Sequence, residues 1–238
     1  MQAPSKQLAV FPRQIVNLQG QSQVLRLVTS DKVYNKLVEV KFKPPTGLRH
    51  WVEEFNLVES DISVGFTHAK ECSKSSFDHA FQYKIMTQIL PTNQYLARYR
   101  VRDSDICDKC HFSTDTILHC IWQCQFVVPF LEKISNFLKE RCNLQENLDC
   151  KQYFFGFKNN AALNNIVIEL KKELFYNWEN YADLDIFIER FVAKVRKVMV
   201  IEKECIKSDQ DFNNYCKKWE KFIDIYDFRG PDPSICNN

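Results

Sequence analysis

Four residues that can bind a soft metal ion lie close together near the middle of the chain, and they constrain its folding most. They follow the pattern C-x2-C-x8-H-x4-C and are Cys107, Cys110, His119 and Cys124. Three thiolates and one imidazole can close a tetrahedron around Zn²⁺, at about 2.3 Å for sulfur and about 2.0–2.1 Å for nitrogen. Four protein ligands leave no coordination position for water, so the pattern predicts a structural zinc site rather than a catalytic one.

Two neighbouring residues compete for a place in this ligand set. His111 follows Cys110, and Cys120 follows His119. Cys120 and Cys124 are four residues apart, which suits one face of a helix. His119 and Cys124 are five apart, which suits a helix only if it ends or unwinds near Cys124. The alternative interpretation is a set of ordinary buried thiols, because free cysteine is among the most buried residue types. Periodicity alone leaves Cys120 as a competing ligand.

Composition limits the class of protein. The chain has 238 residues, enough for one large domain or two small ones, and its 5 glycines disfavour a sandwich or barrel. The net charge of +2 means that nucleic-acid binding would need a local basic patch. The sequence has neither an apolar signal core nor an apolar run of about 20 residues. We therefore expect an intracellular protein of the nucleus or cytoplasm, with no membrane partner and with its 10 cysteines buried or metal-bound rather than in disulfides.

Apolar residues recur at helical spacing along most of the chain, which predicts a mainly α-helical, multi-helix bundle with the CCHC zinc module inserted in it. Ser30 and Thr46 are expected helix N-caps, and Ser76 is expected to begin a further helix. The core stripe of that helix is expected to be Phe77, Phe81, Ile85 and Ile89. Further helical stripes begin at Val128, Leu163, Leu184 and Phe212.

These patterns divide the chain into five segments. We expect an extended linker arm at 1–29, a helical region at 30–100, the zinc-binding module at 101–126, a C-terminal helical region at 127–225 and a disordered tail at 226–238. Within the arm, residues 23–28 have a strand-like or extended character.

Basic and aromatic residues beside the zinc module form a candidate nucleic-acid surface. They are Tyr95, Arg98, Tyr99, Arg100, Arg102 and Lys109. The three arginines are predicted to extend along the helix that holds the two tyrosines. Basic groups beside aromatic rings suit phosphates and unstacked bases. The alternative is local ion pairing, because Asp103, Asp105 and Asp108 follow at once.

Further motifs flank the CCHC pattern. They include Phe81-Gln82-Tyr83-Lys84-Ile85, Leu90-Pro91-Thr92-Asn93-Gln94-Tyr95-Leu96, Thr116 and Trp122. Together they resemble the zinc-binding region of non-LTR (LINE-type) retrotransposon reverse transcriptases, over roughly residues 30 to 222. The resemblance implies Zn²⁺ on Cys107, Cys110, His119 and Cys124. It also implies that Cys120 occupies a position that is usually apolar.

Catalytic motifs are incomplete. Tyr181-Ala182-Asp183-Leu184-Asp185 approaches the reverse-transcriptase Tyr-x-Asp-Asp box, but Leu184 separates the two acids. A polymerase needs acids that hold two divalent metals. We interpret Asp183 and Asp185 as first-turn acids favoured by the helix dipole. Pro231-Asp232 leaves too few residues for the nuclease that some relatives carry. We expect no catalytic residues and no small-molecule substrate.

The sequence thus predicts a non-catalytic C-terminal zinc-binding fragment of a LINE-type reverse transcriptase, whose parent would be an RNA-directed DNA polymerase. The resemblance implies contact with RNA template or target DNA, and with the upstream reverse-transcriptase domains. The alternative is a zinc-stapled protein-interaction or scaffold module that does not bind nucleic acid. A steep salt dependence of binding would favour the first hypothesis.

Overall fold

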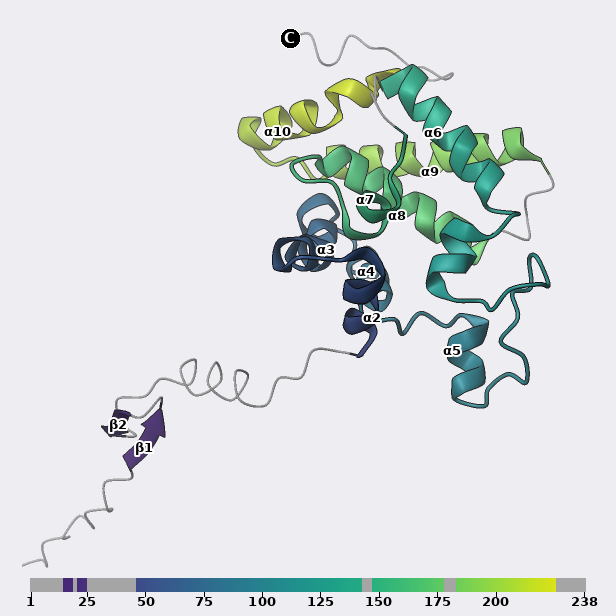
Figure 1. The fold of residues 1–238 in the computed structure, drawn as a ribbon. Coiled ribbons are helices and arrows are strands. Elements are labelled where there is room, and N and C mark those ends of the chain that lie inside the picture. Colours follow the sequence, from purple (N-terminus) through teal and green to yellow (C-terminus); the bar gives the residue numbers. More distant parts are fainter. Residues whose placement is uncertain (1–14, 19–20, 25–45, 143–146, 178–182, 226–238) are drawn as a thin grey trace, which may run out of the picture. The chain divides into compact units, whose positions relative to one another are not determined.

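The computed structural model describes residues 15–18, 21–24, 46–142, 147–177 and 183–225, and the chain divides into two units, Met1–Pro45 and Thr46–Asn238 (Figure 1). In the first unit, β1 (Ile15–Leu18) and β2 (Gln21–Val24) form an antiparallel hairpin. The expected extended character therefore starts earlier than residue 23. The expected helix at Ser30 and the expected tail at 226–238 lie outside the described residues.

The described part of the second unit is mainly helical, which confirms the predicted fold class at that level. Its α-helices are α2 (Thr46–Phe55), α3 (Glu59–Cys72), α4 (Ser76–Met86), α5 (Asn93–Arg98), α6 (Val128–Cys142), α7 (Cys150–Phe155), α8 (Ala161–Tyr176), α9 (Leu184–Glu204) and α10 (Asp209–Trp219). A π-helix, η2 (His119–Gln123), lies between α5 and α6, and a 3-10 helix, η4 (Glu220–Ile225), follows α10. Among these residues, no helix combines the length and apolar content that crossing a membrane requires.

Short polar side chains determine where several of these helices begin. Ser75 accepts a hydrogen bond from the Asp78 amide at the start of α4, and Thr92 accepts one from the Tyr95 amide at the start of α5. Such caps satisfy amides that have no partner within the helix. The predicted start at Ser76 is confirmed, whereas Thr46, an expected cap, is itself the first residue of α2.

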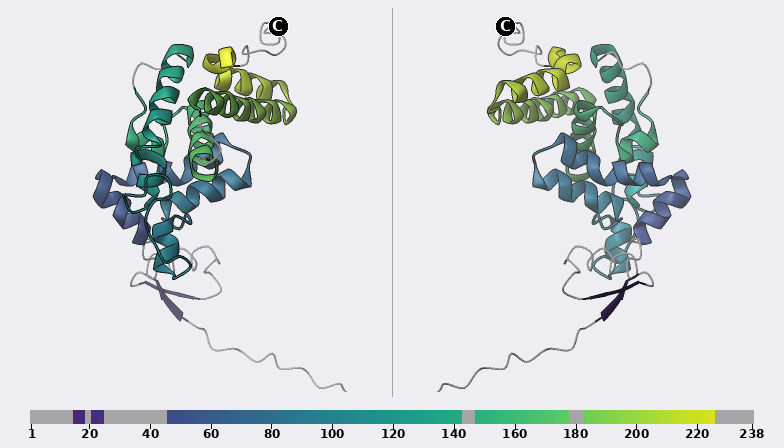
Figure 2. Two further views of the ribbon diagram at one scale, coloured as in Figure 1. Left: turned by 90° about the vertical axis from the view of Figure 1, so that its right-hand side faces the viewer. Right: turned by 90° about the vertical axis from the view of Figure 1, so that its left-hand side faces the viewer.

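Helix α8 forms the centre of the second unit. It packs against α3, α4, α9, α10 and η2, and 12 of its 16 residues are buried. A helix that is buried on most of its faces belongs inside a core. In Figure 2, α9 and α10 (green to yellow) lie side by side at one end of this unit, and Lys218 of α10 donates to the Cys72 carbonyl at the end of α3 at 2.7 Å. The core that surrounds α8 therefore links the N-terminal helices to the C-terminal ones.

The predicted stripe on α4 is only half correct. Phe81 and Ile85 are buried, but Phe77 is 55% exposed and Ile89 is 41% exposed. Ile89 lies beyond the end of α4 at Met86, so it no longer follows the helical period. Phe77 lies in the first turn of α4, where its ring packs at the edge of the core against Tyr176.

A polar cluster lies inside the core. The Lys171 side chain is buried, and its Nζ donates to Gln82 Oε1 at 2.7 Å. Gln82 Nε2 donates to the carbonyl oxygens of Gly65 at 3.1 Å and Phe154 at 2.9 Å. One glutamine therefore connects α3, α4, α7 and α8. Buried polar groups are tolerated when they are hydrogen-bonded in this way.

The stability of the protein should depend on the protonation of Lys171. Burial lowers the pKa of Lys171 from 10.5 to about 7. Between the folded pKa of about 7 and the ordinary value of 10.5, the folded protein gives up a proton that the unfolded chain keeps. The free energy of unfolding should therefore rise with pH in this window, by up to about 1.4 kcal/mol per pH unit. Urea denaturation of the wild type and of Lys171→Met measures the contribution. Equal pH slopes in the two proteins would contradict this assignment.

Candidate metal centre

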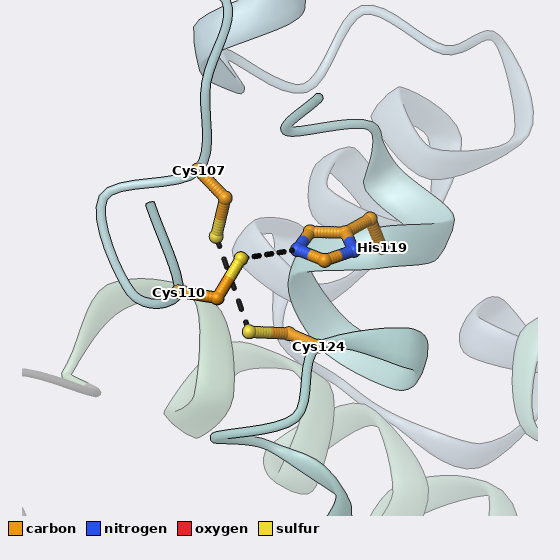
Figure 3. A group of neighbouring side chains, drawn as sticks. All are labelled: Cys107, Cys110, His119 and Cys124. Carbon is orange, nitrogen blue, oxygen red and sulfur yellow. Dashed lines mark hydrogen bonds between the residues drawn. The ribbon is translucent and has the colours of Figure 1, made fainter. Parts of the chain in front are cut away.

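The four predicted ligands converge on one point (Figure 3). Their ligand atoms lie within 4.8 Å of one another, and all four residues are buried. Cys110 Sγ is 3.3 Å from His119 Nε2, and Cys107 Sγ is 4.0 Å from Cys124 Sγ. Donor atoms of a tetrahedral Cys₃His zinc site are about 3.5–3.8 Å apart, as the metal–ligand distances require. The cluster could therefore hold a metal ion with small side-chain movements.

The loop that carries the first two ligands is closed by backbone hydrogen bonds. The Cys107 amide donates to the Ser113 carbonyl at 2.8 Å, and the His111 amide donates to the Cys107 carbonyl at 2.9 Å. Residues Ile106 and Thr114 form an isolated β-bridge across the loop. His111 has a φ of 57°, in the left-handed region, and its side chain is exposed. His111 therefore serves as a turn residue and is not part of the cluster.

The second pair of ligands is positioned by the π-helix η2. His119 is its first residue, and the Cys124 amide donates to the His119 carbonyl at 2.8 Å. A π-turn joins residues five apart instead of four. The five-residue spacing of His119 and Cys124, which suits an α-helix poorly, therefore fits a π-turn. Helical geometry around this pair begins at residue 117 and ends at residue 123.

Cys120, the competing ligand, lies outside the cluster. It is buried, and its Sγ donates to the Ile117 carbonyl at 3.6 Å. Burial raises the pKa of the Cys120 thiol well above its usual value. A protonated, buried thiol of this kind is a packing residue. The implied ligand set of Cys107, Cys110, His119 and Cys124 therefore agrees with the geometry.

The protonation of the cluster favours metal binding at higher pH. Burial raises the pKa of the Cys107 thiol to about 12 and also raises that of Cys124. Burial also acts to raise the pKa of Cys110, but hydrogen bonds from the Phe112 and Ser113 amides and with the Cys107 and Cys124 side chains together hold that pKa below its usual value. Burial lowers the pKa of His119, which keeps its imidazole neutral and able to coordinate. A metal ion would displace the thiol protons, so its affinity should fall as the pH falls.

The proposed nucleic-acid role of Lys109 is wrong. Lys109 is buried, and its Nζ donates to the carbonyl oxygens of Cys120 at 2.5 Å and Leu174 at 3.0 Å. An ammonium group held by two backbone carbonyls inside the protein does not face a phosphate. Lys109 instead ties the metal-binding loop to the C-terminal end of α8. Sequence reasoning missed this role because the burial of a lysine depends on partners that are distant in the chain.

The arginine cluster also differs from its prediction. Helix α5 ends at Arg98, and Arg100 adopts a left-handed φ of 57°, so the three arginines do not lie on one helix. Arg102 donates to Asn93 Oδ1 at 2.6 Å and forms a salt bridge with Asp108 at 2.7 Å, as the ion-pairing alternative expected. Arg98, Tyr99 and Arg100 are exposed, and the rings of Tyr95 and Tyr99 lie 4.9 Å apart.

Asp183 and Asp185, the two acids of the incomplete Tyr-x-Asp-Asp motif, lie at the start of α9. Asp183 caps α9, and its Oδ1 accepts a hydrogen bond from the Asp185 amide at 2.7 Å. This agrees with their interpretation as acids at a helix N-terminus. Over the residues that the structure describes, the Cys₃His cluster is the group of histidine, cysteine and acidic side chains with metal-binding geometry.

Comparison with models of protein families found no match, and comparison with solved structures found none. The fold and the site together define a class: a mainly helical protein with a buried Cys₃His cluster that could hold a metal ion. The similarity to LINE-type reverse transcriptases remains a resemblance of sequence motifs.

Proposed function

We propose that the chain is a zinc-stapled, non-catalytic region of a LINE-type reverse transcriptase that binds nucleic acid beside the polymerase. The observation that carries the proposal is the buried convergence of Cys107, Cys110, His119 and Cys124. The resemblance of motifs supports the choice of family. The exposed basic and aromatic residues beside the cluster are the proposed contact surface for RNA or DNA.

Zinc is the metal that this donor set suits best. Thiolate and imidazole ligands in tetrahedral geometry are typical of Zn²⁺, and a site with four protein ligands is structural. The segment between α5 and η2 has an isolated bridge and turns in place of long helices or strands. Zinc would supply the stabilisation that such a segment lacks, about 10–16 kcal/mol apparent in small zinc fingers.

The nucleic-acid surface in this proposal consists of Tyr95, Arg98, Tyr99 and Arg100. Lys109 and Arg102 are omitted because their side chains are bound to protein groups. Zinc would fix the segment that follows α5 and so hold Tyr99 and Arg100 in place. Stacking on tyrosine and charge pairing with arginine are the contacts that single strands use.

A scaffold role is the second candidate, and exposed apolar side chains favour it. Phe112 is 81% exposed on the metal-binding loop, and Val101 and Phe126 are also exposed at its two ends. Exposed apolar residues that gather on one module often mark a protein-binding surface. The upstream polymerase would be the partner in that case.

Fluorescence anisotropy of the zinc-loaded 238-residue chain with labelled single-stranded RNA and DNA tests the proposal. We expect affinity to fall steeply between about 50 and 200 mM salt. The double variant Arg98→Glu/Arg100→Glu should bind more weakly than the wild type. The matched control Lys70→Glu/Lys158→Glu, with the same change in charge at exposed positions, should bind like the wild type. No binding at about 50 mM salt would reject the proposal and leave the scaffold role.

A further inference from the structure

A groove lies on the second unit, lined by residues from the α3–α4 connection, the first turn of α4, the end of α8 and the C-terminal half of α9. We call it the α8–α9 groove. Its volume is about 710 Å³, and none of its lining residues belongs to the metal-binding module. Ligand sites have typical volumes of about 300–1,000 Å³. The lining residues used below are Lys74, Phe77, Lys172, Tyr176, Lys194 and Lys197.

The carboxylates of this region are buried and paired with lysines. Lys172 Nζ donates to Asp78 at 2.6 Å and to Glu169 at 2.5 Å. Lys194 forms a salt bridge with Glu173, whose side chain is almost fully buried. Because these buried carboxylates are paired with ammonium groups, their side chains are held in place at the bottom of the groove and contribute little negative charge at the surface.

Positive charge gathers at the rim. Lys74 and Lys197 are exposed, and neither forms a salt bridge with another described residue. Burial lowers the pKa of Lys194, and the neighbouring ammonium groups of Lys172 and Lys197 lower it further against the opposing effect of Glu169. Ammonium groups that repel one another in this way would be relieved by an anion.

Two aromatic rings share this rim. Phe77 is 55% exposed and Tyr176 is 46% exposed, and their ring centroids are 6.0 Å apart. Lys172 Nζ lies 5.7 Å from the centroid of the Phe77 ring. Exposed aromatic faces beside ammonium groups are the combination that binds single strands, since bases stack on the rings and phosphates pair with the cations.

We propose that the α8–α9 groove binds a segment of single-stranded nucleic acid, with bases stacked on Phe77 and Tyr176 and phosphates paired with Lys74 and Lys197. The proposal depends on the nucleic-acid function proposed above and gives it a second surface, none of whose lining residues belongs to the metal-binding module. Aromatic rings beside exposed lysines favour single-stranded nucleic acid over an acidic protein helix. Such a helix would need apolar surface in the groove but no flat rings.

Anisotropy titrations of the full chain with labelled oligo(U) and oligo(dT) of equal length test the charge contacts, and the two oligonucleotides separate RNA from DNA as the ligand. Lys197→Glu should weaken binding and reduce the slope of log affinity against log salt by about 0.7, the value for one phosphate contact on a single strand. Lys158→Glu, an exposed lysine outside the groove, is the matched control and should change neither.

Phe77→Leu tests the stacking contact, because leucine keeps an apolar side chain but removes the flat ring. We expect about a tenfold loss of affinity for both oligonucleotides. Tyr83→Leu is the matched control, because Tyr83 is 53% exposed on the same helix but lies outside the groove. An unchanged affinity in Phe77→Leu would reject the groove as a base-stacking site and favour an acidic peptide.

The failure of this inference can be told from the failure of the proposed function. If the wild type binds and Arg98→Glu/Arg100→Glu weakens binding, but Lys197→Glu and Phe77→Leu bind normally, the groove proposal alone is wrong. If the wild type binds neither oligonucleotide at low salt, both proposals are wrong. Thermal unfolding of each variant checks that the fold is retained.

Discussion

Replacing Cys107 with serine is expected to abolish zinc binding and to unfold residues 101–126. The Cys107 thiol is one of four buried donors, and three remaining ligands hold a structural ion far less tightly than four. The loss would be a large share of the about 10–16 kcal/mol that such sites contribute. His119→Ala should have the same effect. Metal analysis of the purified variants and circular dichroism measure the two outcomes.

Cys120→Ser is the matched control for this prediction. Cys120 is a buried cysteine next to a ligand, but it lies outside the cluster. We expect one zinc per chain to remain and the stability to fall by about 1 kcal/mol, because a hydroxyl replaces a buried thiol. If Cys120→Ser loses zinc as completely as Cys107→Ser does, the ligand set is wrong.

Replacing Gln82 with leucine is expected to destabilise the protein by about 3 kcal/mol. The change leaves the carbonyl oxygens of Gly65 and Phe154 without their donor and removes the acceptor of Lys171. Buried polar groups that lose a partner cost about 1–3 kcal/mol each, and a buried charge costs more. Urea denaturation measures the change in the free energy of unfolding.

The control for Gln82 is Gln152→Leu, on the exposed side of α7. It makes the same chemical change without touching the core, so the stability should change by less than about 0.5 kcal/mol. Similar losses of stability in the two variants would contradict a specific contribution of the buried Gln82 hydrogen bonds.

The cluster of candidate metal ligands could be predicted from the sequence because its residues lie close together in the chain. Two cysteines separated by two residues, followed by a histidine and a third cysteine, indicate a group of candidate donors, and the motif resemblance implies the set of four. The spacing of His119 and Cys124 even indicated that a regular helix would not fit, which the π-helix explains. The exclusion of Cys120 could not be predicted from spacing, since the direction of its side chain depends on the local backbone.

Burial was harder to predict than helix formation. The period of apolar residues placed Phe81 and Ile85 on the core face of α4. It could not show that neighbouring helices leave Phe77 at the edge of the core, or that α4 ends at Met86 before it reaches Ile89. The sequence also could not show that Lys109 is buried and hydrogen-bonded to backbone carbonyls. Its partners lie on η2 and at the end of α8, and contacts between residues so far apart leave no local pattern.

The π-turn at His119 has a consequence for how the chain can change in length. Deleting one residue between His119 and Cys124 would let the segment form an ordinary α-helical turn, which is the more favourable backbone. Because residues four apart lie on one face of an α-helix, the shortened segment would still present the imidazole and the last sulfur on the same side. The spacing between the two ligands should therefore tolerate the loss of one residue, whereas one added residue would turn the last sulfur by about 100° away from the other three donors.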